Sequence, residues 1–278
     1  MRRNYTAERK KLRKYLPRFL RQFKEAEGDV ASSYVDRSTT SKWRKRCANI
    51  LQFLTLRNIT IVGVPQKTQQ CCHTNGVRSI NPSNRPSDPF QSVFFHIGEV
   101  KRRKKRVLMA IDGMCASGKS TLARLVAERY VCNVFHMDDF FLPPVMRTIE
   151  RFALPGGNAD VERFETEVME PLLHGDTVRC QRYDCKTGEF IWQPPAEPKP
   201  LEIVEGAYSL HPKLRHAYDL AVGMCVTPEE QLRRIVAREG EARLPDFITH
   251  WIPLEERYLA EIQVWARCDL VIDTSGLF

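Results

Sequence analysis

Gly113-Met114-Cys115-Ala116-Ser117-Gly118-Lys119-Ser120 is the stretch of this 278-residue sequence that decides the fold. It fits the pattern G-x-x-x-x-G-K-[ST], in which backbone amides surround phosphate oxygens, the lysine reaches the β- and γ-phosphates, and the hydroxyl binds Mg²⁺. We therefore expect a phosphate-binding loop with ATP and Mg²⁺ as cofactors. The residues expected to contact the nucleotide are Gly113, Ala116, Ser117, Gly118, Lys119, Ser120 and Thr121.

The segments on both sides of this loop support the interpretation. Residues 107–111 form a short apolar run typical of a buried strand, and residues 121–129 carry apolar side chains at helical spacing. Strand, glycine loop and helix is the order that a phosphate-binding loop requires. The loop is therefore predicted to connect the first strand of a sheet to a helix.

Composition limits the class of protein. The chain is 42% hydrophobic, which is enough for a core, and no window approaches ~18 consecutive apolar residues, so we expect no membrane span. The nine cysteines form no C-x-x-C pair, and their number is odd. This pattern favours reduced thiols and a cytoplasmic location over a disulfide framework.

The net charge of +9 is unevenly distributed. Residues 1–106 carry 25 Lys and Arg against 7 Asp and Glu, whereas residues 107–278 carry 18 against 27. The acidic part contains the Gly113–Ser120 loop, which argues against nucleic acid as its partner. We predict two regions: a basic, poorly ordered extension with a Pro-, Ser- and Asn-rich linker over 1–90, and a domain over 91–278 that contains the Gly113–Ser120 loop.

The basic extension leaves several functions open. Residues 1–30 have a basic amphipathic pattern, which suits an anionic membrane contact, a nucleic-acid arm, an organelle presequence or a solvated extension, and the last is favoured. The basic run 101–106 directly precedes the first strand. We interpret it as a solvated strand entry that could add positive potential near bound phosphates.

From residue 107 onward, strand-like and helix-like segments alternate. This alternation predicts a three-layer αβα fold with a mainly parallel, five-stranded sheet. The expected strands are 107–111, 132–137, 201–204, 219–226 and 268–272.

Carboxylates follow two of these strands. Asp138 and Asp139 come after the strand 132–137, and Glu205 ends the strand that begins at 201. Ligands in open α/β sheets bind beyond the carboxyl ends of the strands, so these acids should lie beside the Gly113–Ser120 loop. One of the paired aspartates could accept a proton from an attacking hydroxyl, and Glu205 could join Ser120 at Mg²⁺.

The remaining candidates lie in loops and in one helix. Asp160 precedes a helix over 161–174 and is expected to cap it, and residues 181–189 are predicted to form a turn between two strands. A later helix begins at Thr227 and Pro228. It and the following turn carry arginines that could neutralise phosphate charge, namely Arg233, Arg234, Arg238 and Arg243.

These segments, in this order, resemble the uridine kinase-like branch of the P-loop nucleoside kinases, in the phosphoribulokinase and uridine kinase superfamily. The resemblance rests on Ile111–Ser120, His136–Phe141, Arg182-Tyr183-Asp184, Ile203–Gly206 and the arginine helix, and it covers about 107–278. It implies that Asp138 is the general base for a ribose hydroxyl and that Lys119 and Arg238 act in catalysis.

The resemblance also implies a substrate site and a lid. By it, Asp160 looks like the ligand of the ribose hydroxyls, while Tyr183 and Asp184 occupy the place of the base pocket and Asp139 lies at the acceptor. Arg238 and Arg243 look like the arginines of a lid over the nucleotide, and Arg234 and Arg243 are the candidates to contact the nucleotide. The implied partner is a small-molecule acceptor.

Two classes of function follow. The first is ATP-dependent phosphorylation of a nucleoside-like acceptor of the uridine or cytidine type, with nicotinamide riboside, other nucleosides and other small alcohols left open. The second is a nucleotide-binding switch or relic domain with a basic arm for nucleic acid or anionic lipid. A homo-oligomer is compatible with either.

Overall fold

The computed structural model describes residues 90–277, and the predictions made for residues 1–89 lie outside this part of the chain. The main sheet has five strands, all parallel, in the order β2-β5-β1-β6-β7. This confirms the predicted fold class. The strands are β1 (Val107–Gly113), β2 (Cys132–His136), β5 (Leu201–Glu205), β6 (Leu220–Cys225) and β7 (Leu270–Asp273). A separate antiparallel ribbon pairs β3 (Gln181–Asp184) with β4 (Glu189–Trp192), around the predicted turn.

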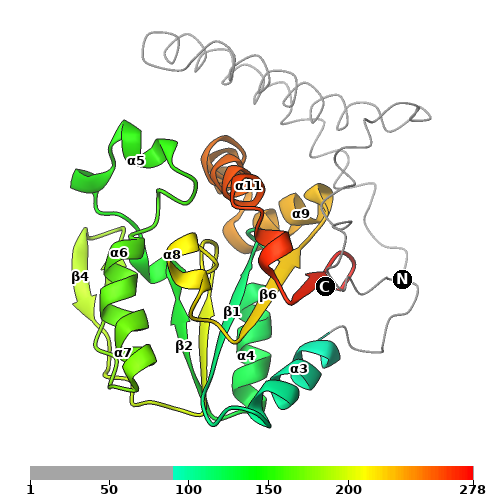
Figure 1. Cartoon of the computed structure of the whole chain (residues 1–278). Helices are drawn as coiled ribbons and strands as arrows, with labels where there is room; N and C mark the ends of the chain where they lie inside the picture. Colours follow the sequence, from blue (N-terminus) through cyan, green and yellow to red (C-terminus); the bar gives the residue numbers. More distant parts are fainter. Residues whose placement is uncertain (1–89, 278) are drawn as a thin grey trace, which may run out of the picture. The chain divides into compact units, whose positions relative to one another are not determined.

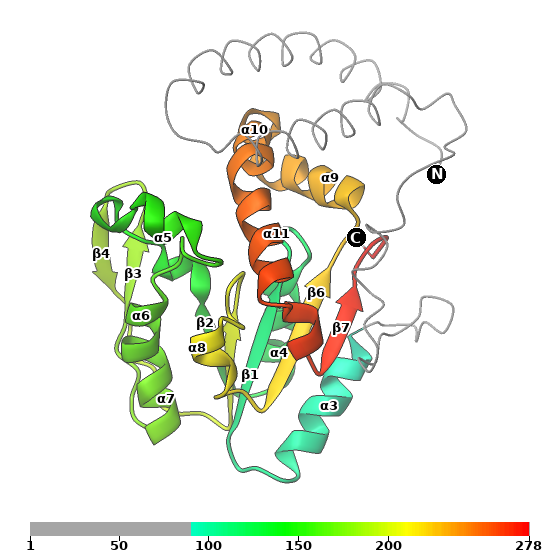
Figure 2. The ribbon, with the colours of Figure 1, turned by 45° about the horizontal axis from the view of Figure 1, so that its top comes forward.

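The central strands are buried on both faces, as expected of a parallel sheet covered by helices. All seven residues of β1 are buried, and its side chains alternate between two hydrophobic clusters. Val107, Met109 and Ile111 pack with α3 (Gln91–Lys101) and α4 (Lys119–Arg129). Leu108 and Ala110 face the opposite cluster. The helices therefore form two layers with the sheet between them, which Figures 1 and 2 show from two directions.

The second helical layer is assembled from short segments. A continuous helix runs through α6 (Val161–Phe164), the π-helical turn η5 (Glu165–Met169) and α7 (Glu170–His174), which confirms the helix predicted over 161–174. The longer helices near the chain end are α9 (Pro228–Glu239) and α11 (Ile252–Glu261). The other short elements are η3 (Met137–Phe140), η4 (Pro144–Met146), α5 (Ile149–Ala153), α8 (Pro212–Arg215), η6 (Glu241–Arg243), α10 (Leu244–Asp246), η7 (Phe247–Trp251) and η8 (Val264–Arg267).

One edge of the sheet collects the segments with chemically active side chains. Because the strands are parallel, the ends of β1, β2 and β5 lie together, and the register pairs Ile111 with Glu205 and His136 with Glu205. Helix α9 lies beyond this edge, close to the end of β6 (Figure 1). The fold thus brings the Gly113–Ser120 loop, the two aspartates and the arginine helix to one end, as ligand sites in open α/β sheets require.

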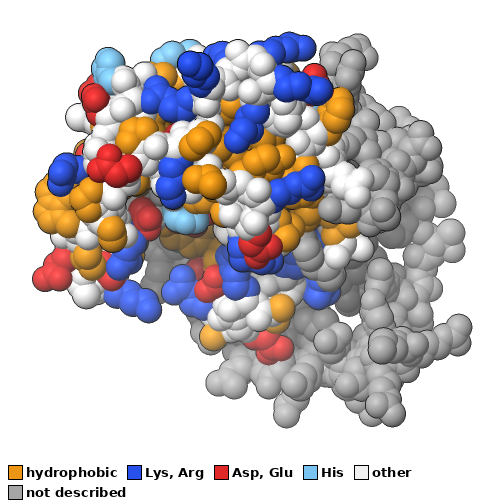
Figure 3. Space-filling model, turned by 90° about the horizontal axis from the view of Figure 1, so that it is seen from below, with side chains coloured by type: hydrophobic (Ala, Val, Ile, Leu, Met, Phe, Trp, Pro, Cys, Tyr) orange, Lys and Arg blue, Asp and Glu red, His pale blue; other side chains and the backbone are white. Residues whose placement is uncertain are grey.

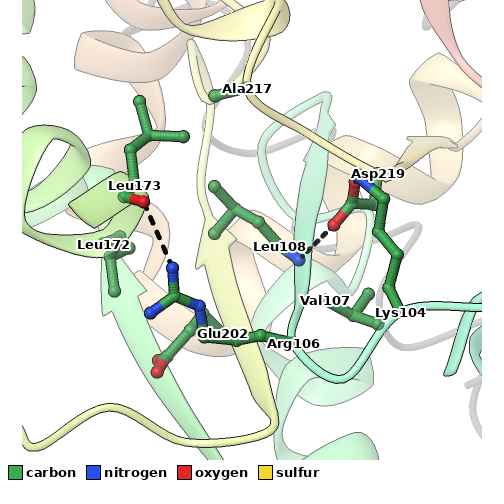
Figure 4. Close-up of a pocket in the computed structure, with 9 residues that line it drawn as sticks. All are labelled: Lys104, Arg106, Val107, Leu108, Leu172, Leu173, Glu202, Ala217 and Asp219. Carbon is green, nitrogen blue, oxygen red and sulfur yellow. Dashed lines mark hydrogen bonds and ion pairs between the residues drawn. The ribbon is translucent and has the colours of Figure 1, made fainter. Parts of the chain in front are cut away.

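The basic run 101–106 lies at the other end of β1. Lys104 forms an ion pair with Asp219, and Arg106 donates to the carbonyl oxygen of Leu173 at 3.2 Å. These contacts line a pocket of about 170 Å³ (Figure 4). Lys and Arg side chains are spread across this face among fewer Asp and Glu side chains (Figure 3). The run directly precedes β1, as predicted. The expectation that it adds positive potential near bound phosphates is wrong, because the Gly113–Ser120 loop lies at the other end of β1 and a seven-residue strand spans roughly 20 Å.

None of the helices described in residues 90–277 is long and apolar enough to cross a membrane. Six cysteines belong to the described part of the chain, and all six are free thiols: Cys115, Cys132, Cys180, Cys185, Cys225 and Cys268.

The half-buried ring of His211 predicts a pH dependence of stability. Its Nδ1 accepts a hydrogen bond from the amide of Lys213 at the start of α8, and burial lowers the pKa of His211 to about 4. Between pH 6.5 and pH 4 the unfolded chain therefore binds more protons than the folded protein does. The contribution of His211 to the free energy of unfolding is present in full above pH 6.5 and is lost as the pH falls through this window.

We expect the loss to be about 1–2 kcal/mol after allowance for solvent screening. Urea unfolding at pH 7 and pH 5 measures it, and His211→Asn should flatten the difference while the same change at the exposed His250 should not. Equal pH dependence in wild type and His211→Asn would contradict the assignment.

Candidate functional site

The Gly113–Ser120 loop depends on glycine at both ends. Gly113 has φ +136°, and a Cβ there would lie 2.0 Å from the carbonyl oxygen of Met224 on β6. Gly118 has φ +93° and precedes the first residue of α4. Both φ values lie in the region that favours glycine. The loop is therefore pressed against the neighbouring strand and turns sharply into the helix.

A buried carboxylate holds the base of this loop. Asp112 is completely buried, and it accepts hydrogen bonds from the amides of Gly113 and Leu210 at 2.6 and 2.7 Å and from the Tyr258 hydroxyl at 2.7 Å. Burial raises the pKa of Asp112, and these hydrogen bonds act in the opposite direction. Asp112 ties the end of β1 to the segment after β5 and to α11.

The start of α4 has the features of an anion site. No side chain caps this 11-residue helix, so its first amides lack the usual side-chain acceptor, and the helix dipole favours negative charge there. The ammonium of Lys119 donates to the carbonyl oxygens of Gly113 and Met114 at 2.9 and 2.8 Å, which keeps it over the loop. Nearby, the Ser117 hydroxyl is buried and makes no hydrogen bond within the described residues.

Ser120, Glu205 and His136 form a chain of hydrogen bonds beside Lys119. The Ser120 hydroxyl donates to the two carboxylate oxygens of Glu205 at 3.1 and 3.3 Å. Nδ1 of His136 lies 2.5 Å from Oε1 of Glu205, and this hydrogen bond raises the pKa of His136. The carboxylate of Glu205 is therefore oriented toward Ser120 by a second partner.

The Ser120 hydroxyl and the Glu205 carboxylate suit Mg²⁺, but they do not by themselves complete its coordination shell. No group of three or more His, Cys, Asp or Glu side chains among residues 90–277 could hold a metal ion. A hydroxyl and a carboxylate side by side are nevertheless what Mg²⁺ needs when phosphate oxygens and waters supply its other ligands. Ser120 and Glu205 thus lie in contact, and their role at Mg²⁺ stays a prediction.

Asp138 and Asp139 lie in η3, directly after β2. The Asp138 side chain is exposed to solvent, but desolvation by the protein around it raises the pKa of its carboxyl group. The positive charge of Lys119 is the largest opposing effect, and those of His136 and Arg238 act in the same direction as Lys119. Burial also raises the pKa of Asp139, whereas the positive charges of His136 and Arg182 lower it. Asp138 therefore shares the electrostatic environment of the loop lysine.

Asp160, predicted from the resemblance as a substrate ligand, already has local partners. Its Oδ1 accepts a hydrogen bond from the backbone amide of Arg163 at 3.2 Å, which confirms the predicted helix cap. Its Oδ2 accepts from Nε of Arg163 at 3.3 Å. The guanidinium of Arg163 also packs over the ring of Phe140 at 4.1 Å. The structure thus assigns Asp160 a part in joining α6 to the segment after Asp139.

Tyr183 and Asp184 lie in the ribbon of β3 and β4. Tyr183 is buried and its ring packs against Phe190, with 5.2 Å between ring centroids. The Asp184 carboxylate accepts hydrogen bonds from the backbone amides of Lys186 and Thr187 at 2.8 and 3.3 Å, which confirms that Asp184 stabilises the predicted turn. In this conformation both side chains stabilise the ribbon.

The four arginines differ in their surroundings. Arg234 is largely buried, and it donates to the carbonyl oxygens of Ala116 at 3.2 Å and Thr274 at 2.6 Å, so it holds the loop to the segment after β7. Arg238 is half exposed, pairs with Glu239 and acts on the charge of Asp138. Arg233 pairs with Glu230, and Arg243 with Asp246 at 3.4 Å. Arg238 thus contributes positive charge at Asp138.

Two residues of the site were missed from the sequence. Glu255 on α11 is buried and accepts from the amide of Cys115 at 2.7 Å, and Gln231 on α9 donates to the carbonyl oxygen of Cys115 at 3.1 Å. Burial raises the pKa of Glu255, and Lys119 opposes this shift most strongly. The sequence did contain a signal for Glu255, because this acidic residue lies at helical spacing on the same buried face of α11 as Tyr258 and Leu259.

Comparisons with known proteins give structural likeness only. No family model matches the chain, and no curated protein matches it. Among solved structures, a possible uridine kinase from Bacillus stearothermophilus is 22% identical, with a TM-score of 0.49, over 66% of this chain and 98% of that one. A phosphoribulokinase from Rhodobacter spheroides is 16% identical, with a TM-score of 0.41, over 61% of this chain and 70% of that one.

Proposed function

We propose that this protein is an ATP-dependent kinase that transfers the γ-phosphoryl group to a hydroxyl of a small, nucleoside-like acceptor, of the uridine or cytidine type. The observation that carries the proposal is the meeting of three features at one edge of the sheet. They are the uncapped Gly113–Ser120 loop with Lys119, the hydrogen-bonded pair of Ser120 and Glu205, and the carboxylate of Asp138.

In this proposal the loop binds the nucleotide. The amides from Ala116 to Thr121 and the ammonium of Lys119 hold the phosphates, and Lys119 exchanges its carbonyl contacts for phosphate oxygens. Ser120 and Glu205 hold Mg²⁺, which when bound offsets the negative charge of the phosphoryl oxygens. Arg234 supports the loop through the carbonyl of Ala116.

Asp138 is the proposed general base. It accepts the proton of the acceptor hydroxyl, and the nearby charges of Lys119 and Arg238 favour its ionised form against the effect of desolvation. Arg238 in α9 and Arg243 in η6 offset the negative charge that develops on the phosphoryl group during transfer. Asp139 and Asp160 border the acceptor site, and Tyr183 and Asp184 border it from the ribbon. A reducing compartment such as the cytoplasm suits the free thiols.

An acceptor panel tests the proposal. The full-length protein is incubated with ATP, Mg²⁺ and each of uridine, cytidine, other nucleosides, nicotinamide riboside and simple polyols, and ADP release is followed. We expect acceptor-dependent ADP release that a metal chelator abolishes. ADP release that no acceptor increases would reject the kinase assignment, whereas turnover of a polyol alone would reject only the nucleoside class.

A further inference from the structure

Cys115, the third residue of the Gly113–Ser120 loop, is held at both polar groups of its backbone. Its amide donates to Oε2 of Glu255 on α11 at 2.7 Å, and its carbonyl oxygen accepts from Nε2 of Gln231 on α9 at 3.1 Å. Its side chain is buried and packs in a small hydrophobic cluster with Ile235 of α9. Two helices near the chain end thus hold the first half of the loop.

The carbonyl oxygens from Gly113 to Gly118 all accept hydrogen bonds from the protein. Their donors are Lys119 for the first two, then Gln231, Arg234, Thr274 and the amide of Leu122. In a trans peptide, the carbonyl oxygen of one residue and the amide of the next point in opposite directions. Gln231 and Thr274 therefore direct the amides of Ala116 and Gly118 away from themselves. Within residues 90–277 neither of these two amides donates a hydrogen bond, so both are available to a ligand.

The backbone of Ala116 is strained, and α9 holds it. Its φ is +57°, a left-handed conformation that residues with a side chain seldom adopt. Such a conformation persists where the surrounding structure fixes it. Gln231 binds the carbonyl oxygen that precedes Ala116, and Arg234 binds that of Ala116 itself at 3.2 Å. The conformation of the loop therefore depends on contacts that lie more than a hundred positions further along the chain.

The charge of Glu255 is unusual at this place, because a carboxylate near bound phosphates repels them. Glu255 is 9% exposed. Burial and the charge of Asp138 raise its pKa, whereas the charge of Lys119 is the largest effect that lowers it. Glu255 thus shares the electrostatic environment of the loop lysine and of the proposed base. Its hydrogen bond to the Cys115 amide, rather than its charge, is the feature that suits a nucleotide site.

We infer that Glu255 and Gln231 are positioning residues, which hold the loop in its phosphate-binding conformation without contacting the nucleotide. The inference rests on the proposed function in taking ATP as the ligand of the loop. Loss of either contact releases one side of the Cys115 backbone. Ala116 then relaxes from its left-handed conformation, and its amide turns away from the phosphates. The affinity for ATP falls, while the acceptor site stays as it is.

The test measures the Kd of ATP with Mg²⁺ by isothermal titration calorimetry on the full-length protein, without an acceptor. Glu255→Leu removes the partner of the Cys115 amide, and Gln231→Leu removes the partner of its carbonyl oxygen. Each change should raise the Kd roughly tenfold or more, because a buried hydrogen bond that orders the loop is lost. Glu261→Leu, at the exposed end of α11, should leave the Kd within roughly twofold of wild type.

Glu255→Gln separates the hydrogen bond of Glu255 from its charge. The side-chain carbonyl of glutamine accepts a hydrogen bond from the Cys115 amide as the carboxylate does, but the side chain is neutral. We expect this variant to bind ATP as tightly as wild type or up to roughly tenfold more tightly, because a negative charge near the phosphates is removed. A Kd as high as that of Glu255→Leu would show that the hydrogen bond is not the contribution of Glu255.

Further measurements separate positioning from a general loss of structure. Circular dichroism without nucleotide reports whether each variant folds. Amide hydrogen exchange in the loop should be faster in Glu255→Leu than in wild type and should return to the wild-type rate in Glu255→Gln. With the best acceptor of the panel, the acceptor KM of Glu255→Leu and Gln231→Leu should stay within roughly twofold of wild type while the ATP KM rises.

The outcomes are separable from those of the proposed function. An unchanged Kd in both leucine variants, or an acceptor KM that rises in parallel with the ATP KM, overturns the inference. If Glu255→Leu does not fold, Gln231→Leu and Glu255→Gln decide it by the same criteria. If the wild-type protein binds ATP but phosphorylates no acceptor, the proposed function fails, and the Kd values still decide the inference. If the wild-type protein binds no ATP, both fail.

Discussion

Replacement of Asp138 by asparagine should lower kcat by roughly 10²–10⁴-fold, the range expected when a general base is lost. The amide keeps the size of the side chain but cannot accept the proton of the acceptor hydroxyl. Because Lys119, Ser120 and Glu205 are untouched, the ATP KM should change little. Steady-state kinetics with the best acceptor measure both constants.

The pH profile of the wild-type enzyme provides a control for the same residue. Desolvation raises the pKa of Asp138 above its ordinary value of 3.8, so the base becomes protonated, and kcat/KM falls, as the pH drops through this raised pKa. Asp138→Asn should lack this acidic limb, whereas Asp139→Asn should keep it. Wild-type kcat in Asp138→Asn would remove Asp138 from the proton transfer.

Replacement of Gly113 by alanine should cost roughly 3–5 kcal/mol of unfolding free energy, because overpacking and a disfavoured backbone conformation add together. The added methyl group would lie 2.0 Å from the carbonyl oxygen of Met224, and φ +136° suits only glycine. The strand β6 would have to move away, and the hydrogen bond from the amide of Met114 to that carbonyl would break. Urea unfolding of the full-length protein measures the loss.

Gly98 is the matched control for Gly113→Ala. It lies within α3, and a Cβ there would meet no atom within 4 Å. Gly98→Ala should therefore be neutral or stabilise the protein by up to about 1 kcal/mol, as alanine favours a helix. An equal effect at the two positions would show that the close approach of the loop to β6 is not the cause.

The sheet could be predicted from the sequence because its strands are buried on both faces. Such strands read as short apolar runs, and each of the five predicted runs overlaps a strand of the structure. The turn at Asp184 and the cap at Asp160 were predictable for a different reason. Their side chains bond to backbone amides only two or three residues away, so local sequence contains the whole interaction.

The contacts between distant segments could not be predicted in this way. Glu255 reaches the amide of Cys115 across 140 positions, and Arg234 reaches the carbonyl of Ala116 across 118. Nothing near either residue in the sequence identifies its partner, because the pairing depends on where α9 and α11 pack.

The proposed reaction transfers the γ-phosphoryl group directly from ATP to a hydroxyl. The measurement that tests it most directly is mass spectrometry of the acceptor after incubation with Mg²⁺ and ATP that carries an isotopic label in its γ-phosphoryl group. We expect a labelled phosphomonoester of the acceptor, formed in equal amount with ADP and formed at least roughly 100-fold more slowly in Asp138→Asn. Label found only in inorganic phosphate, with the acceptor unmodified, would contradict it.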